Sequence, residues 1–186
     1  MSSGLIDAST FIINTLAQLY ILVLLLRLLL PWLNGDFRNP LVQAILKLTS
    51  PVVVPVRRVV PPIGRVDTAT LLIAFAVQYL AILVILLIKG FAATIAPIAL
   101  TALIDLVMIT IRLFVFAVLI RVILSWVAPG MHNPATAIIE TLTQPVLRPL
   151  QRFLPAIGGL DLSPLFAMIL LTALNIVIAP LRPIPI

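Results

Sequence analysis

The feature that most constrains this chain is an internal duplication: residues 39–67 return as residues 133–161, 94 positions later and without a gap. The shared register extends back to Arg27 and its counterpart Arg121. Sixteen positions repeat their residue, and the members in the first copy are Arg27, Leu30, Trp32, Asn39, Pro40, Ile45, Leu48, Thr49, Pro51, Val52, Pro55, Arg58, Pro61, Ile63, Gly64 and Asp67. Prolines, charges, a glycine and a tryptophan in one register indicate a tandem duplication of one structural unit.

The composition indicates that lipid surrounds most of the chain. Of its 186 residues 62% are hydrophobic and only 10% are charged, with a mean hydropathy of +1.27. A soluble domain needs more polar surface than this. The absence of cysteine excludes disulfides, thiol catalysis and thiolate metal sites. The formal net charge is +6, and because basic residues flank apolar segments, it favours an anionic membrane surface over nucleic acid as the partner.

The hydropathy pattern predicts four membrane-spanning helices, at about residues 9–30, 68–88, 102–124 and 162–181. Each is close to the roughly 20 residues that a bilayer core requires. Two proline-rich amphipathic segments, here called the elbows, lie between the spans of each copy, at about residues 39–60 and 133–154. The prediction is an all-α integral membrane protein of two tandem parallel repeats, residues 1–90 and 102–186. Residues 91–101 are expected to be an apolar connector.

Each elbow is predicted to be a proline-kinked pair of amphipathic helices in the membrane interface. In the first elbow, Asn39 and Pro40 form a helix start, with an N-cap followed by proline at the first helical position. Ser50-Pro51 is expected to end this helix and to start another, which Pro55 kinks. The arginines would lie among lipid phosphates. A shallow re-entrant hairpin is the alternative.

The basic residues predict the orientation. Those near the elbows are Arg38, Lys47, Arg57, Arg58, Arg65, Arg148 and Arg152, whereas the opposite side carries only Lys89 and Arg182. The excess of positive charge on cytoplasmic loops places both elbows in the cytoplasm and both termini outside. Because each repeat contributes two spans, the repeats are expected to share one orientation and a pseudo-two-fold axis along the membrane normal.

Two charged pairs recur in the duplication. Arg27 and Arg121 lie near the same ends of the first and third spans, and Asp67 and Asp161 begin the spans that follow. A charge inside the membrane needs a partner, so we predict structural pairs Arg27–Asp67 and Arg121–Asp161. A plain helix cap is the alternative role for each aspartate.

Other polar residues in the spans do not recur. Asp105 and Arg112 lie two helical turns apart on one face of the third span, so an internal pair or a water-mediated link is plausible. Asn14 and Gln18 share a face of the first span. We predict a polar path for an ion or proton along Asn14, Gln18, Asp105 and Arg112, with ordinary hydrogen bonding between helices as the alternative.

Signals of an enzyme are absent from the sequence. The single histidine, His132, lies beside a helix start without a carboxylate cluster, and Gly158-Gly159 lacks the strand–turn–helix context of a nucleotide loop. The elbows have few aromatic residues for stacking on bases. We therefore expect no enzyme activity, no cofactor or metal, and no nucleic-acid partner.

The repeated motif resembles that of the bacterial YggT family, called YlmG in some bacteria and chloroplasts. The pattern is R-x₃-[PS]-W, then N-P, then L-T-x-P-V-x-x-P-x-x-R-x-x-P-x-I-G-x-x-D, and it spans residues 27–67 and 121–161. The second copy fits the family better, because the first has Val54, Arg65 and Asp67-Thr68-Ala69 where the second has Arg148, Gly159 and Asp161-Leu162-Ser163. The resemblance implies an integral protein of the bacterial inner membrane linked to osmotic-shock tolerance and to potassium or ion homeostasis. Other relatives are linked to cell or plastid division, nucleoid distribution and assembly of a plastid cytochrome complex.

Two functions remain open at this point. The first is ion homeostasis under osmotic stress, with the protein as a transport component; because four spans enclose little room, a pore would need a homo-oligomer. The second is a membrane scaffold or assembly factor, in which the elbows bind anionic lipid or a protein partner. The expected contact residues for the second function are Arg57, Arg58, Arg148 and Arg152.

Overall fold

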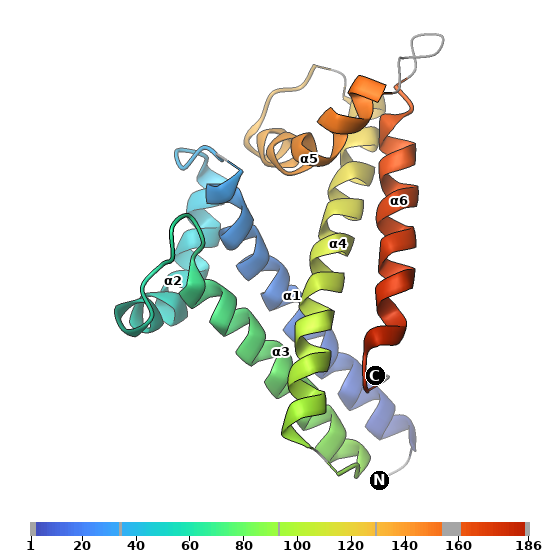
Figure 1. Ribbon diagram of the computed structural model, residues 1–186. Coiled ribbons are helices and arrows are strands. Elements are labelled where there is room, and N and C mark those ends of the chain that lie inside the picture. Colours follow the sequence, from blue (N-terminus) through green and yellow to red (C-terminus); the bar gives the residue numbers. More distant parts are fainter. Residues whose placement is uncertain (1–2, 34, 93, 129, 154–160, 185–186) are drawn as a thin grey trace.

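The computed structural model describes residues 3–33, 35–92, 94–128, 130–153 and 161–184 (Figure 1). The elements, in chain order, are α1 (Ser3–Trp32), α2 (Pro40–Val59), α3 (Thr68–Lys89), α4 (Ile95–Val127), α5 (Pro134–Phe153), α6 (Ser163–Ile178) and the 3₁₀ turn η1 (Ala179–Leu181). The described residues contain no β-strand, apart from one isolated bridge between Ile63 and Val66. The predicted all-helical fold is confirmed.

Four helices are long and apolar enough to cross a membrane: α1, α3, α4, and α6 continued by η1. The chain is therefore a multi-pass membrane protein. The spans predicted at residues 9–30, 68–88, 102–124 and 162–181 fall on these four helices. Both α1 and α4 are longer than predicted, with 30 and 33 residues.

The connector predicted at residues 91–101 is wrong from residue 95 onward, where α4 begins. Thr94 is the extended residue before the first turn of this helix. Pro97 falls in that first turn, where backbone N–H groups have no partner within the helix, so a proline there costs no hydrogen bond. Pro97 is therefore compatible with a helix start.

Each elbow contains one helix rather than a pair. The break expected at Ser50-Pro51 does not occur, because α2 continues through Pro51 and Pro55, and α5 contains their equivalents Pro145 and Pro149. A proline removes the N–H that would bind the carbonyl four residues earlier. In α2 these carbonyls belong to Lys47 and Pro51, which are exposed, so water or lipid headgroups can hydrate them. The expected end of the second elbow at residue 154, and Pro155, Ile157, Gly158 and Gly159, lie outside the described residues.

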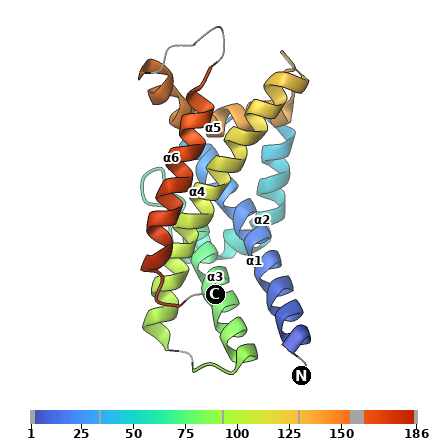
Figure 2. The same cartoon turned by 90° about the vertical axis from the view of Figure 1, so that its right-hand side faces the viewer.

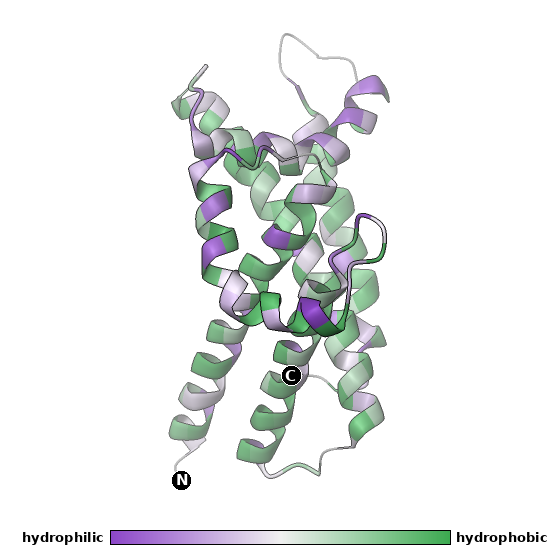
Figure 3. Cartoon of the chain, turned by 90° about the vertical axis from the view of Figure 1, so that its left-hand side faces the viewer, coloured by the Kyte–Doolittle hydropathy of each residue, from purple (hydrophilic) through white to green (hydrophobic). Residues whose placement is uncertain are grey.

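The spans pack as two helical hairpins. Helix α1 packs mainly on α3, and α4 packs mainly on α6, while α3 and α4 join the two hairpins. Helix α2 covers α1 and α3, and α5 covers α4 and α6. Figures 1 and 2 show α5 at one end of the bundle, α2 at its flank near the middle, and both chain termini toward the other end. Figure 3 shows hydrophilic residues gathered on the short helices and their loops, whereas the opposite end is mainly hydrophobic.

The apolar core extends from the hairpins into the elbows. Its main cluster joins α1, α2, α3 and α4 and contains Ile21, Leu24, Leu25, Val53, Ala69, Ile73, Ala74, Leu106, Ile109 and Leu113. A second cluster, Val118, Leu147 and Ala167, lies under α5. Val53 and Leu147 occupy equivalent positions of the two repeats, and both are fully buried. Buried alanines on the spans allow the helix backbones to approach closely.

Candidate functional site

Six polar side chains converge on one cavity between the spanning helices. The cavity has a volume of about 200 Å³ and is lined by Asn14, Gln18, Gln78, Asp105, Met108, Ile109, Arg112 and Arg182. The structure thus brings together all four residues that the sequence placed on a polar path, two from α1 and two from α4. Sequence reasoning missed Gln78 on α3 and Arg182, which follows η1.

Hydrogen bonds connect part of this lining. Gln18 Nε2 donates to Asn14 Oδ1 at 3.2 Å, as their four-residue spacing on one helix allows. Gln78 Nε2 donates to Asp105 Oδ2 at 2.9 Å and links α3 to α4. Gln78 is only 3% exposed, and its Oε1 has no hydrogen-bond partner among the described residues. A polar cavity of this size has room for several water molecules, which such unpaired groups can bind.

The acidic residue of the cavity pairs with a different arginine from the one expected. Asp105 Oδ1 lies 3.5 Å from Arg182 Nη1, because the chain after η1 turns back toward α4. A direct contact between Asp105 and Arg112 is not formed in the described part of the chain, so the direct pair is corrected, whereas the water-mediated link stays a prediction. Seven residues of a helix rise about 10 Å, and Arg182 supplies a nearer cation.

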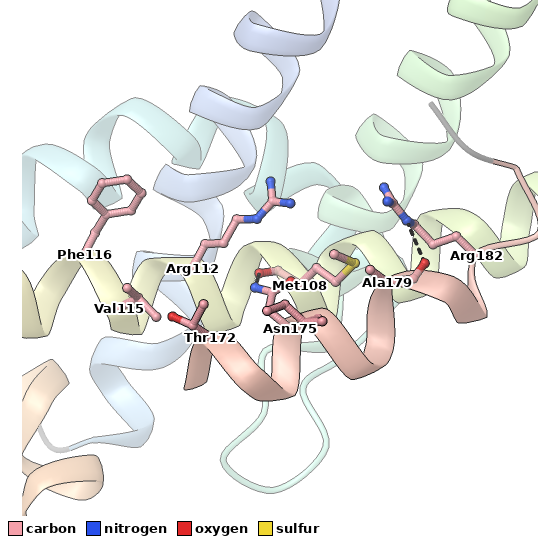
Figure 4. A pocket seen from close by; sticks show the side chains of 9 residues that line it. Met108, Arg112, Val115, Phe116, Thr172, Asn175, Ala179 and Arg182 are labelled. Carbon is pink, nitrogen blue, oxygen red and sulfur yellow. Dashed lines mark hydrogen bonds between the residues drawn. The ribbon is translucent and has the colours of Figure 1, made fainter. Parts of the chain in front are cut away.

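Arg112 is an exposed cation inside a spanning helix. No hydrogen bond or ion pair joins it to any of the described residues, while it also lines a second cavity of about 310 Å³ against α6. The two cavities share Met108, Arg112 and Arg182. Figure 4 shows the guanidinium groups of Arg112 and Arg182 extending to the same side of α4. A charge inside a spanning helix is costly unless water or a counter-ion reaches it, and the two cavities leave open space beside this one.

The duplication shows that the polar residues of the cavity differ between the two repeats. Gln18 and Arg112 are equivalent positions of the two repeats, and Gln78 corresponds to Thr172. The position equivalent to Asp105 is the exposed Phe11. The polar residues of the cavity are thus residues that the duplication did not repeat, and this difference is the signal that identified Asp105 and Arg112 in the sequence.

The repeated arginine of the first span holds the first elbow. Arg27 is 5% exposed, and its Nη1 donates to Thr49 Oγ1 at 2.7 Å and to the carbonyl of Leu46 at 3.3 Å, both on α2. Its Nε lies 3.7 Å from Asp67 Oδ2. The structure therefore brings Arg27 and Asp67 together, but the threonine hydroxyl of the elbow is the closest partner of the guanidinium.

The second repeat keeps the threonine contact without the ion pair. Arg121 Nη1 donates to Thr143 Oγ1 at 2.8 Å. The predicted pair Arg121–Asp161 is not formed among the described residues, because Asp161 instead accepts from Gln151 Nε2 at 2.8 Å. The prediction is corrected for this repeat: an uncharged side chain of α5 binds the aspartate.

Each aspartate is held by the same position of its own repeat. Asp67 accepts from the guanidinium of Arg57, and Arg57 corresponds to Gln151 in the duplication. Asp67 also caps α3 through Thr70, so the cap and the charge contact coexist. Burial raises the pKa of Asp67, but hydrogen bonds from Arg57 and Thr70 outweigh it, so the pKa is lowered.

The pKa of Asp161 is lowered in the same way. Burial again raises it, and the hydrogen bonds from Ser163 and Gln151 outweigh the burial. Asp161 is exposed, so nearby water weakens both the effect of burial and the effect of the hydrogen bonds on its pKa. The ionised form of both aspartates is therefore the form that suits the folded protein.

The basic residues predicted to contact lipid or a partner are exposed on α2 and α5; they are Arg57, Arg58, Arg148 and Arg152. Arg57 is engaged by Asp67, whereas the other three form no hydrogen bond or ion pair within the described ranges. His132 is exposed and its Nδ1 lies 2.8 Å from the carbonyl of Gly130. No group of three His, Asp or Glu side chains able to hold a metal ion occurs in the part of the chain that the structure describes.

We predict that Thr49→Val destabilises the protein by about 1–3 kcal/mol, because the buried guanidinium of Arg27 loses its shortest hydrogen bond. Thr143→Val should cost less, since Arg121 is only half-buried. Unfolding of the purified protein in detergent micelles measures both. Thr141→Val is the matched control, because Thr141 binds a carbonyl of its own helix and no arginine. An equal loss at Thr141 would contradict the proposed role of the contact.

We also predict a pH dependence that reports on Asp67. Its folded pKa is lowered, so its stabilising effect is present above the unfolded pKa of about 4 and is lost as the pH falls through the folded value. Asp67→Asn should therefore be less stable than the parent protein at pH 7, and the difference should shrink toward pH 3. Thermal unfolding across this range measures it, with Glu140→Gln, an exposed change on α5, as control. A difference that is constant with pH would refute the assignment.

Comparison with known proteins agrees with this architecture. The CCB3/YggT family model matches twice, at residues 6–88 and 100–182, one match for each repeat. An uncharacterized protein of Pseudomonas aeruginosa is 38% identical over 177 residues, which cover 94% of this chain and 90% of that protein. The uncharacterized protein YggT of Escherichia coli K12 is 38% identical, over 91% of this chain and 88% of its own length. A protein of Vibrio alginolyticus is 40% identical, over 88% and 89% of the two chains. No solved structure matches the chain. With two matches that together span most of its length, the chain belongs to the CCB3/YggT family.

Proposed function

We propose that the protein is a non-enzymatic component of ion transport in the bacterial inner membrane, and that it supports ion homeostasis, including that of potassium, and tolerance of osmotic stress. The observation that supports this proposal is the polar cavity between the spans, where six polar side chains from three helices and the C-terminal segment converge. Polar and ionised side chains inside a membrane are costly, and they commonly mark the route of an ion or proton.

The arrangement of the cavities suggests how such a route would run. The cavity of about 200 Å³ meets the larger one of about 310 Å³ at Met108, Arg112 and Arg182. Open space therefore extends on both sides of α4, mainly polar in the smaller cavity and mainly apolar in the larger one. One chain encloses only a short stretch of it. We therefore propose that a homo-oligomer, or a membrane-protein partner, completes the route.

The orientation is part of the proposal. The two repeats would lie parallel, related by a pseudo-two-fold axis along the membrane normal, with both elbows on the cytoplasmic face and both termini outside. The basic residues of α2 and α5, which face away from the bundle, support this orientation. Accessibility labelling of single cysteines placed at residues 58 and 148, in a chain without native cysteine, would test it.

The transport proposal predicts flux of ions through the purified protein in proteoliposomes. Under an osmotic or ion gradient, the flux of potassium, protons or chloride should exceed that of empty liposomes. Arg112→Ala should change it severalfold, because this substitution removes the cation at the junction of the cavities. Arg152→Ala, which removes an exposed arginine from α5, is the control and should leave the flux unchanged. Flux that is insensitive to Arg112 would place the route elsewhere.

A scaffold or assembly factor is the second candidate, supported by the exposed arginines of the elbows. Asn39 Nδ2 donates to the carbonyl of Pro134 at 2.7 Å, so the starts of α2 and α5 are joined and their basic surfaces keep a fixed relation. Such a surface suits anionic lipid headgroups or an acidic cytoplasmic protein.

The scaffold proposal predicts that binding of anionic lipid depends on the exposed arginines of the elbows, whereas the transport proposal makes no such prediction. Replacing Arg58, Arg148 and Arg152 together with glutamine should reduce binding of anionic lipid severalfold while the cavity stays intact. Lipid retention by the purified protein, measured by mass spectrometry, would show the loss. A triple variant that retains as much anionic lipid as the parent protein would exclude this surface as the lipid site.

A further inference from the structure

The ionised side chains around the two cavities do not balance. Asp105, Arg112 and Arg182 line them, so two positive charges face one negative charge. Asp105 is occupied by Arg182 at 3.5 Å and by Gln78 at 2.9 Å. Arg112 forms no ion pair or hydrogen bond with the described residues, so it is the cation of the cavity lining that lacks a direct partner.

We propose that Arg112 binds an exchangeable anion where the two cavities meet, and that Arg182 forms the second positive wall of this site. A guanidinium in a low-dielectric span requires a counter-ion or bulk-like hydration. Arginine is the side chain best suited to hold chloride or an oxyanion, because its fork presents several N–H donors at once. The shared chemistry is a compact negative group held by the guanidinium.

The polar neighbours fit this ligand. Both side chains of α1 that line the smaller cavity, Asn14 and Gln18, have amide N–H groups in addition to the one used in their mutual hydrogen bond. On the other side, the hydroxyl of Thr172 lines the larger cavity beside Arg112. A cation at this place would lie between two arginines and would be repelled by both. In this inference the cavity takes an anion, and potassium homeostasis would follow from charge balance with that anion. The unpartnered Oε1 of Gln78 would accept from the water that accompanies the anion.

Two sources could supply the negative group: a free ion from water, or the phosphate of a lipid that enters between α4 and α6. Arg112 lies 17 residues into α4, which is about 25 Å along the helix, and it faces a polar cavity. The experiment has one arm for each source. The inference rests on the proposed function, since it names the class of ion that the same cavity takes.

The test is thermal unfolding of the purified protein in detergent, without a membrane, so that binding is measured apart from transport. Potassium gluconate is replaced by potassium chloride or potassium phosphate at constant ionic strength, which keeps the cation constant. In a separate arm, phosphatidylglycerol is added to the gluconate buffer. A ligand bound only by the folded protein should raise the unfolding temperature by roughly 3–6 °C as its site fills.

Arg112→Gln should abolish this rise. Glutamine is a suitable replacement because Gln18 occupies the equivalent position of the first repeat. Arg112→Lys, which keeps the charge, should retain a smaller rise, and it also serves if the glutamine variant does not fold. Arg65→Gln removes an equal charge from the exposed loop between α2 and α3, outside the arginines proposed to contact lipid, and should behave like the parent protein.

The outcomes separate the alternatives. A rise with chloride or phosphate that requires Arg112 supports a site for a free anion, whereas an Arg112-dependent rise with phosphatidylglycerol alone identifies a lipid phosphate as the ligand. The absence of any rise in the parent protein, or an equal rise in Arg112→Gln, would overturn the inference. An Arg112-dependent rise without flux in proteoliposomes would retain the anion site and refute the transport proposal.

Discussion

The buried guanidinium of Arg27 needs hydrogen-bond acceptors from the protein, and the arrangement of the repeat supplies them. A charge inside a spanning helix has no water to solvate it, so protein groups must supply acceptors. Thr49 and Leu46 on α2 do so, at 2.7 and 3.3 Å. The elbow helix is thereby held against its hairpin, and Val53, one turn further along α2, enters the core. The contact between Arg121 and Thr143 has the same geometry, so one interaction positions both elbows.

The duplication separates structure from candidate function. Repeated residues such as Asn39, Thr49 and Asp67 cap helices or join an elbow to its spans. The cavity instead uses positions where the copies differ, above all Arg112 opposite Gln18 in the register. A second copy of a structural unit frees some positions from their original packing. The unmatched polar residues can then form a site between the hairpins that neither repeat contains alone.

The candidate site was predictable only where a residue contrasts with its surroundings. Asp105 and Arg112 are charged residues in an apolar span and do not recur in the first repeat, so hydropathy and the duplication together singled them out. Arg182 was assigned to the outer side of the membrane, and its contact with Asp105, 77 positions away, depends on how η1 redirects the chain. The predicted pair between Arg121 and Asp161 is wrong, because Gln151 binds the carboxylate instead. Comparing only residues that are identical in both repeats could not reveal the position where Arg57 is replaced by Gln151.

The sequence by itself determined the helical class, the four spans and the twofold repetition, because hydropathy and register are properties of the linear chain. It also placed the starts of α2 and α3 at Asn39 and Asp67, since capping is local chemistry. Only the tertiary structure decided that the elbow helices continue through their prolines, that Arg182 pairs with Asp105, and that six polar side chains share one cavity. These features depend on which groups are exposed and which helices meet, and packing between distant segments decides both.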